Sequence, residues 1–115
     1  MSLLGEVLRP RGPVQFELSE QRVEDGLLMR VAGELDVLTV PQLASRLDEL
    51  IRSHAEDLVI NLDAATFIDS VGLHALLNAQ RRLARRGRNL SVVCAGGQVR
   101  RVIDMARLAD ALNLV

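Results

Sequence analysis

The chain has 115 residues, of which 49% are hydrophobic, and its 14 basic residues nearly balance 15 acidic ones. This length is typical of a single domain that buries enough surface to fold without disulfides or structural metals. The net charge of -1 argues against direct binding to nucleic acid, which needs a basic excess. No apolar run is long enough to insert in a membrane, and the single cysteine, Cys94, favours a reducing, cytoplasmic location.

Residues 1–13 are predicted to form a flexible N-terminal extension, and residues 14–115 to form the domain. Glycines and prolines interrupt the extension, and it lacks a signal-peptide core. Apolar and polar residues alternate over 14–18, which predicts a half-buried strand. A second strand is predicted over 27–33, and the turn at 24–26 makes the two strands a hairpin.

Helices and strands alternate through the rest of the sequence. Strands joined by helices pair in parallel through right-handed crossovers, so we expect an α/β domain with a mixed sheet of four or five strands and three or four helices. A helix is predicted to start at Thr39, with Pro41 in its first turn, and to continue to about Ser53. The later elements are a strand at 58–62, a helix at 71–86 ended by Gly87, a strand at 90–94, a helix at 99–106 and an edge strand at 112–115.

The helix predicted at 71–86 has an apolar stripe and a basic end. The stripe is predicted to face the core, whereas the arginines are interpreted as a solvated face that complements the helix dipole. A docking patch for an acidic partner is the alternative interpretation of the arginines. The stripe consists of Leu73, Leu76, Leu77, Leu83 and Ala84, and the arginines are Arg81, Arg82, Arg85, Arg86 and Arg88.

The most informative segment, residues 67–73, opens this helix. Either Asp69 or Ser70 can serve as the N-cap, a common and purely structural role. A serine at this position is also predicted to be accessible, at the carboxyl end of a strand. A phosphate there would face the free N–H groups of the first turn, and its charge would lie beside Asp69. The segment therefore allows two interpretations: a purely structural helix start, or a site that can carry a phosphate and change binding without unfolding the domain.

Three segments together resemble a known family. Gly-Glu-Leu-Asp at 33–36 followed by Thr39, the strand at 59–62, and Phe-Ile-Asp-Ser-Val-Gly-Leu at 67–73 resemble the STAS domain of bacterial anti-sigma factor antagonists. The resemblance extends from about residue 14 to the C-terminus. It implies the STAS (SpoIIAA-like) α/β fold.

The resemblance also implies a partner-switching function. Ser70 would be phosphorylated by an anti-sigma factor that is itself a serine kinase, and a phosphatase would reverse the modification. The unphosphorylated protein would bind the anti-sigma factor and release a sigma factor. Many relatives carry a second Ser or Thr where Val71 stands, so the motif has one candidate hydroxyl. The implied partner-binding residues are Asp36, Thr39, Asp69, Ser70, Val71, Gly72, Leu73 and His74.

Other functions are less well supported by the residues. A STAS domain can also serve as a non-switching adaptor in a transport or stress-signalling complex, with Ser70 only at a helix start. An enzyme is not expected, because Ile68 occupies the glycine position of a nucleophile elbow and neither His54 nor His74 is well placed as a base. The histidines and Cys94 show no metal-ligand spacing, and Gly96 with Gly97 is interpreted as a turn. No metal or cofactor is expected.

Overall fold

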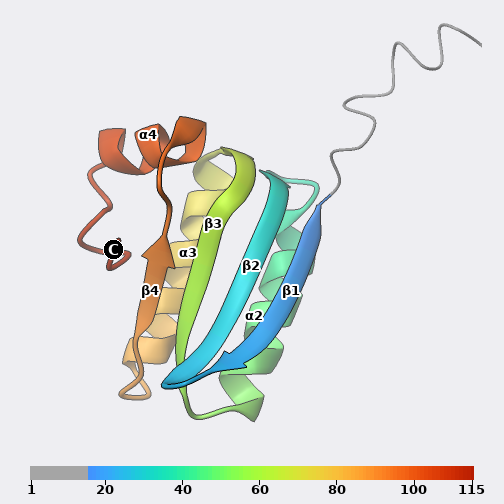
Figure 1. Cartoon of the computed structure of the whole chain (residues 1–115), viewed down its shortest axis with the longest axis vertical. Helices are drawn as coiled ribbons and strands as arrows, with labels where there is room; N and C mark the ends of the chain where they lie inside the picture. Colours follow the sequence, from blue (N-terminus) through green and yellow to red (C-terminus); the bar gives the residue numbers. More distant parts are fainter. Residues whose placement is uncertain (1–15) are drawn as a thin grey trace, which may run out of the picture.

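The computed structural model of the chain describes residues 16–115 (Figure 1). The predicted N-terminal extension and the first two residues of the predicted first strand lie outside the described residues. The elements follow in the order β1 (Glu17–Val23), β2 (Gly26–Leu35), α2 (Val40–Ser53), β3 (Asp57–Ile68), α3 (Ser70–Ala84), β4 (Leu90–Val93) and α4 (Gly97–Met105).

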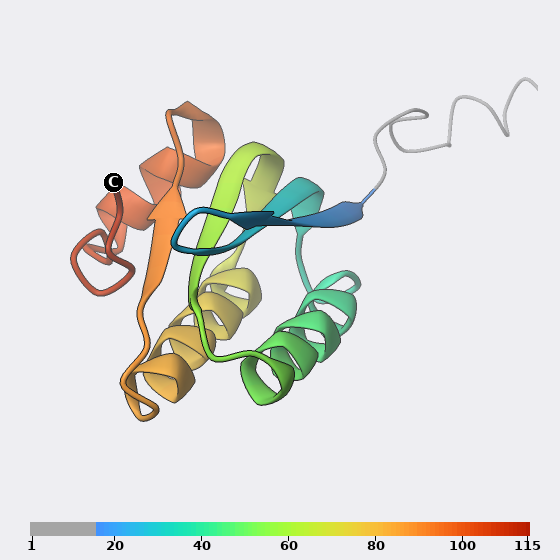
Figure 2. The ribbon, with the colours of Figure 1, turned by 60° about the horizontal axis from the view of Figure 1, so that its bottom comes forward.

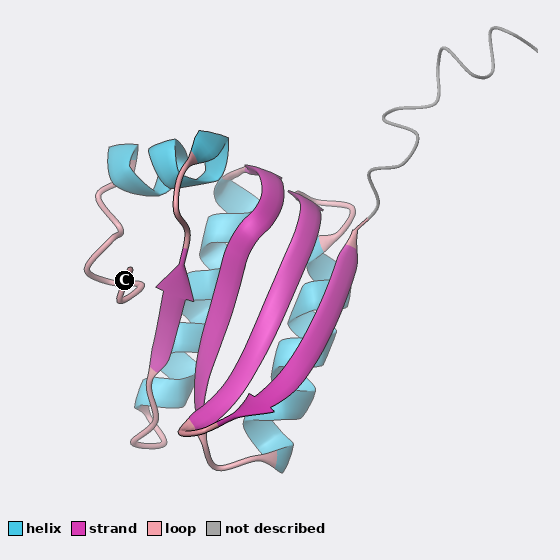
Figure 3. Cartoon of the chain, viewed as in Figure 1, coloured by secondary structure: helices cyan, strands magenta, loops and turns pink. Residues whose placement is uncertain are grey.

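The strands form one mixed sheet in the order β1-β2-β3-β4. The hairpin pair β1 and β2 is antiparallel, and β2 with β3 and β3 with β4 are parallel. Helices α2 and α3 lie side by side on one face of the sheet, while α4 lies near the end of β3 (Figures 2 and 3). The predicted mixed α/β architecture is confirmed, with four strands and three helices among residues 16–115.

The core lies between the sheet and the two long helices. Alternate residues of β2 and β3 point into it, and Met29, Val31 and Ile60 are fully buried. The apolar positions predicted for the first helix are all buried: Leu43, Leu47, Leu50 and Ile51. The stripe predicted for α3 is partly wrong, because Ala84 is exposed and Ala79 is buried in its place.

Three strand predictions differ from the structure. β1 begins at Glu17 and continues to Val23 through a polar segment, because pairing with β2 holds this edge strand in place. β3 continues past residue 62 to Ile68 and so extends beyond the predicted strand at 58–62. The predicted C-terminal edge strand is a single parallel bridge between Val92 and Leu114.

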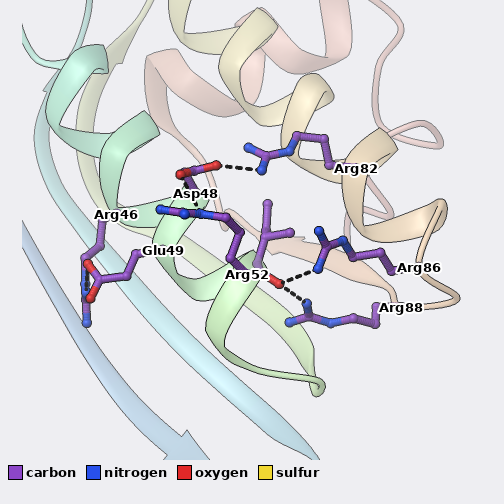
Figure 4. A network of polar contacts seen from close by, with 8 residues as sticks. Arg46, Asp48, Glu49, Arg52, Arg82, Arg86 and Arg88 are labelled. Carbon is purple, nitrogen blue, oxygen red and sulfur yellow. Dashed lines mark hydrogen bonds and ion pairs between the residues drawn. The ribbon is translucent and has the colours of Figure 1, made fainter.

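The arginine cluster of α3 and the following loop does not form a uniformly solvated face (Figure 4). Arg82 donates to the Asp48 carboxylate at 2.6 Å, and this contact holds the pKa of Asp48 below its usual range. Arg88 is 7% exposed and donates to the carbonyl oxygens of Ile51 and Glu56 at 2.9 and 2.7 Å. The interpretation of a solvated face is therefore wrong for Arg88, which binds one carbonyl near the end of α2 and one in the loop that follows it.

Replacing Arg88 by Met should destabilise the fold by about 1–3 kcal/mol, because buried carbonyl oxygens lose charged donors. The loss is moderated because burial, which lowers the pKa of Arg88, already makes its charge costly. The same change at exposed Arg81 should stay within about 0.5 kcal/mol. Urea unfolding followed by circular dichroism measures both, and equal midpoints would contradict the structural role of Arg88.

Candidate functional site

The predicted site residues are gathered where β2 and β3 end together. The parallel pairing runs to the last residues of both strands, where Leu35 lies opposite Ile68. Asp69 N–H then donates to the Leu35 carbonyl oxygen at 3.3 Å, so the chain leaves β3 in contact with β2. Residues 36–39 follow β2, and α3 follows β3, which brings the two segments of the motif to one edge of the sheet.

Asp69 is the N-cap of α3, and Ser70 is the first helical residue. The Asp69 carboxylate accepts a hydrogen bond from the Gly72 N–H at 3.1 Å. Ser70 is exposed, and its hydroxyl bonds to none of residues 16–115. Of the two N-cap residues that the sequence allowed, the structure selects Asp69. The serine hydroxyl therefore remains accessible beside the free N–H groups that open a helix.

Gly72 lets the first turn of α3 sit directly on the end of β2. A Cβ atom at this position would lie 2.9 Å from the Leu35 carbonyl oxygen and 2.7 Å from Cγ1 of Ile68. Real Cβ atoms do not approach backbone oxygen this closely, so only glycine permits this packing. Leu73, the next residue, is 8% exposed and belongs to the core, whereas His74 is exposed.

Asp36 and Thr39 order the loop between β2 and α2. One oxygen of the half-buried Asp36 carboxylate accepts from the N–H groups of Leu38 and Thr39 at 3.0 and 3.2 Å. The Thr39 hydroxyl donates to the Glu34 carbonyl oxygen at 2.6 Å and accepts from the Asp36 N–H at 3.0 Å. These bonds give both residues a structural role in the loop, in addition to any contact with a partner.

Exposed apolar side chains occur in the segments next to Ser70, a feature that the sequence predictions included only in part. Val71 was among the predicted residues, and it is 40% exposed. Leu38 is 85% exposed and lies in the adjoining loop. The sequence signal that could have predicted this feature is the apolar pair Val37 and Leu38 within a loop. Four of the six large apolar residues exposed in the described part of the chain are at this edge, and we call them the apolar rim: Val37, Leu38, Phe67 and Val71.

The cysteine and the acidic residues give no sign of a metal centre. Cys94 is buried, and burial raises the pKa of its thiol, which fits the predicted role as a small core residue. Within residues 16–115, no group of three or more His, Cys, Asp and Glu side chains could hold a metal ion. The helices in this part of the chain are also too short or too polar to span a bilayer.

The fold and the strand-to-helix site together are those of a STAS domain. The chain matches the STAS domain family over residues 7–115 and belongs to that family. The resemblance inferred from the three sequence segments is thereby confirmed.

Among its relatives are several anti-sigma factor antagonists. The anti-sigma-B factor antagonist of Staphylococcus epidermidis is 29% identical over 91 residues, which cover 79% of this chain and 84% of the relative. The crystal structure of an anti-sigma factor antagonist from Mycobacterium paratuberculosis is 28% identical, with a TM-score of 0.78 and coverage of 87% and 85%. The names of these relatives describe antagonists of another protein, in agreement with the prediction of a non-enzymatic protein.

A more distant solved structure shares the fold. SpoIIAA in its unphosphorylated form superposes with a TM-score of 0.71 at 20% identity, covering 86% of this chain and 88% of that one. At this identity the likeness concerns the fold alone. It agrees with the SpoIIAA-like architecture expected from the sequence.

Replacing Gly72 by Ala should destabilise the protein by about 1–3 kcal/mol, because the added methyl group overlaps the Leu35 carbonyl. This cost exceeds the about 0.5–1 kcal/mol that alanine gains over glycine in a helix. Gly96→Ala is the control, because a Cβ at Gly96 meets no described atom within 4 Å, and its effect should stay within about 1 kcal/mol. Thermal unfolding compares them, and a stabilised Gly72→Ala would contradict the close packing.

Proposed function

We propose that this protein is an anti-sigma factor antagonist whose binding is switched by phosphorylation of Ser70. The observation that carries the proposal is the exposed Ser70 hydroxyl at the first position of α3, with the capping role taken by Asp69. A modification of Ser70 therefore does not remove the helix cap. This separation is what a reversible switch requires, because the domain must stay folded in both states.

The electrostatics of the helix start favour a phosphate that stays at the surface. The phosphate adds about 1.5 to 2 negative charges at pH 7, next to the free N–H groups and the positive end of the helix dipole. The new charge also lies beside the Asp69 carboxylate, so the edge of the sheet becomes strongly negative. The fold tolerates this charge at an exposed position, whereas a partner pressed against the same edge must desolvate it.

The apolar rim supports a partner-binding role for the unphosphorylated edge. Side chains such as Leu38 and Val71 are costly to expose, and an interface that covers them gains hydrophobic free energy. A dianion on Ser70, at the same edge of the sheet, would have to be buried without a matching cation, at a cost of several kcal/mol. Phosphorylation thus opposes binding by the same contacts that make the unphosphorylated surface favourable.

The partner class follows from the relatives. Their names identify them as anti-sigma factor antagonists, and we infer an anti-sigma factor as the partner of this chain. In the proposed cycle the partner is of the serine-kinase type and phosphorylates Ser70, and a phosphatase restores binding. Of the predicted contact residues, Asp69 and Val71 adjoin Ser70, His74 is exposed further along α3, and Asp36 and Thr39 lie in the loop after β2. The buried residues Gly72 and Leu73 act through the packing of the first turn.

Ser70→Asp should weaken binding to a serine-kinase-type anti-sigma factor of the same genome by several hundred-fold. This corresponds to a loss of about 3–4 kcal/mol from a charge-sensitive interface. Ser70→Ala should bind like the unmodified protein and should not be phosphorylated in the presence of ATP. Isothermal titration calorimetry gives the affinities, and intact-mass spectrometry with site mapping gives the modification.

A matched control is Ser45→Asp, which places the same charge at an exposed position of α2, in the groove toward β1. It should leave affinity unchanged. If Ser70→Asp and Ser70→Ala both bind like the unmodified protein, the switch is refuted, and Ser70 serves only as the first residue of α3, as in a non-switching adaptor.

Leu38→Ser should weaken the same complex about tenfold while leaving the unfolding midpoint unchanged. A side chain that is 85% exposed contributes little to folding, but its burial by a partner contributes about 1.5 kcal/mol. Met105→Ser is the matched control, because Met105 is 82% exposed on α4 and lies outside the apolar rim. Equal affinities for the two variants would show that the rim does not contact the partner.

A further inference from the structure

The two edges of β3 are satisfied in different ways. Toward β2, pairing continues to Ile68, but toward β4 it runs only from Leu58 to Asn61. β4 ends at Val93, and the chain then turns away into α4. The second half of β3 therefore has no neighbouring strand on that side among residues 16–115, although its backbone continues to Ile68, two residues before Ser70.

A side chain takes the place of the missing strand at Ile68. The Ile68 N–H donates to Oε1 of Gln98 at 3.0 Å, and Nε2 of Gln98 donates to the Ile68 carbonyl oxygen at 3.2 Å. The carboxamide has an acceptor oxygen and a donor NH2 group, so it can bond to the N–H and the C=O of one residue as a neighbouring strand would. Both bonds involve partly buried groups, and Ile68 itself is 1% exposed.

The helix that carries Gln98 is anchored to the core. Gly97 has a φ of 83°, a left-handed conformation that favours glycine at the turn into α4. The following turns place Val99 and Ile103 in the core, where they are 1% and 0% exposed. α4 packs against β3 near the end of that strand (Figure 1). Gln98 therefore belongs to a helix that is packed against the core, and its position is fixed by that packing.

The two hydrogen bonds from Gln98 hold β3 at its last residue, directly before the turn that leads to Ser70. Ile68 is followed by Asp69, whose N–H bonds to Leu35. Cγ1 of Ile68 also packs against Gly72 in the first turn of α3, so closely that a Cβ atom at residue 72 would overlap it. Ile68 is therefore held on one side by β2, on the other side by Gln98, and from above by α3. A shift of this residue would move the turn that presents the serine.

We propose that Gln98 is a positioning residue for Ser70: its carboxamide holds the β3–α3 turn in the geometry that a kinase and a binding partner recognise. The proposal rests on the function proposed above for Ser70. It assigns to α4, which lies outside the predicted motif, a part in presenting the switch. A displacement of about 1 Å at a reacting group can cost a hundredfold in rate, so loosening this turn should be visible in phosphorylation.

Two substitutions distinguish the contributions of the two Gln98–Ile68 hydrogen bonds. Gln98→Leu keeps the size of the side chain and removes both bonds. Gln98→Glu keeps the acceptor for the Ile68 N–H but loses the donor to the Ile68 carbonyl. Gln80→Leu is the matched control, because it makes the same change on α3 at an amide that bonds to no described residue.

NMR of the full chain, without any partner, tests whether Gln98 holds the β3–α3 turn. In Gln98→Leu, amide exchange at Ile68 and Asp69 should become about tenfold faster, and the Ile68 amide proton and carbonyl carbon shifts should both move. In Gln98→Glu, the carbonyl shift should move while the amide proton stays near its original value. Gln80→Leu should change neither. Unchanged exchange and shifts in Gln98→Leu would overturn the proposal.

Phosphorylation by the serine-kinase-type anti-sigma factor reads the functional part. The initial rate at Ser70 should fall at least tenfold in Gln98→Leu and stay constant in Gln80→Leu. If the unmodified chain is phosphorylated and Gln98→Leu matches its rate, the positioning role is refuted while the proposed function stands. If the unmodified chain is not phosphorylated at all, the proposed function fails, and with it the role of Gln98 in presenting a switch.

Discussion

The parallel pairing of β2 and β3, continued to the last residue of each strand, is the constraint on which the rest of the site depends. Because Leu35 and Ile68 lie opposite each other, the chain leaves both strands at one edge. The first turn of α3 is then seated on the Leu35 carbonyl through Gly72, at a distance that no other residue permits. The loop at 36–39 and the start of α3 meet only because the two strands end in register.

Within this frame, the stabilising role and the proposed regulatory role belong to neighbouring residues. Asp69 satisfies the backbone at the helix start, and the adjacent Ser70 hydroxyl makes no bond within the described chain. A similar division applies to the loop, where Asp36 and Thr39 bond to the backbone and Leu38 points into solvent. The groups that hold the edge together are thus distinct from the groups available to a partner. Such a surface can change its binding properties without a change of fold.

Contacts between segments far apart in the sequence explain the predictions that were wrong. Arg88 was grouped with solvated arginines because a charged residue after a helix is usually exposed, yet carbonyls near the end of α2 and in the loop after it bind Arg88 in the interior. Gln98 gave no signal at all, since a glutamine in a first helical turn is ordinary, and its partner lies 30 residues away. The apolar residues Val37 and Leu38 were visible in the sequence, but only the ends of β2 and β3 bring them near Ser70.

The sequence by itself determined the alternation of helices and strands, the core positions of α2 and the motif that marks the family, because these depend on local periodicity and on residues close together in the chain. The tertiary structure alone decided which residue caps α3, how far β3 extends and what satisfies its open edge. These depend on where distant backbone groups lie, and a hydrogen bond across such a distance leaves no periodic trace. Residue types alone do not decide whether Asp69 or Ser70 caps α3, or that Gln98 bonds to the edge of β3 in place of a strand. The three-dimensional positions of these groups decide both.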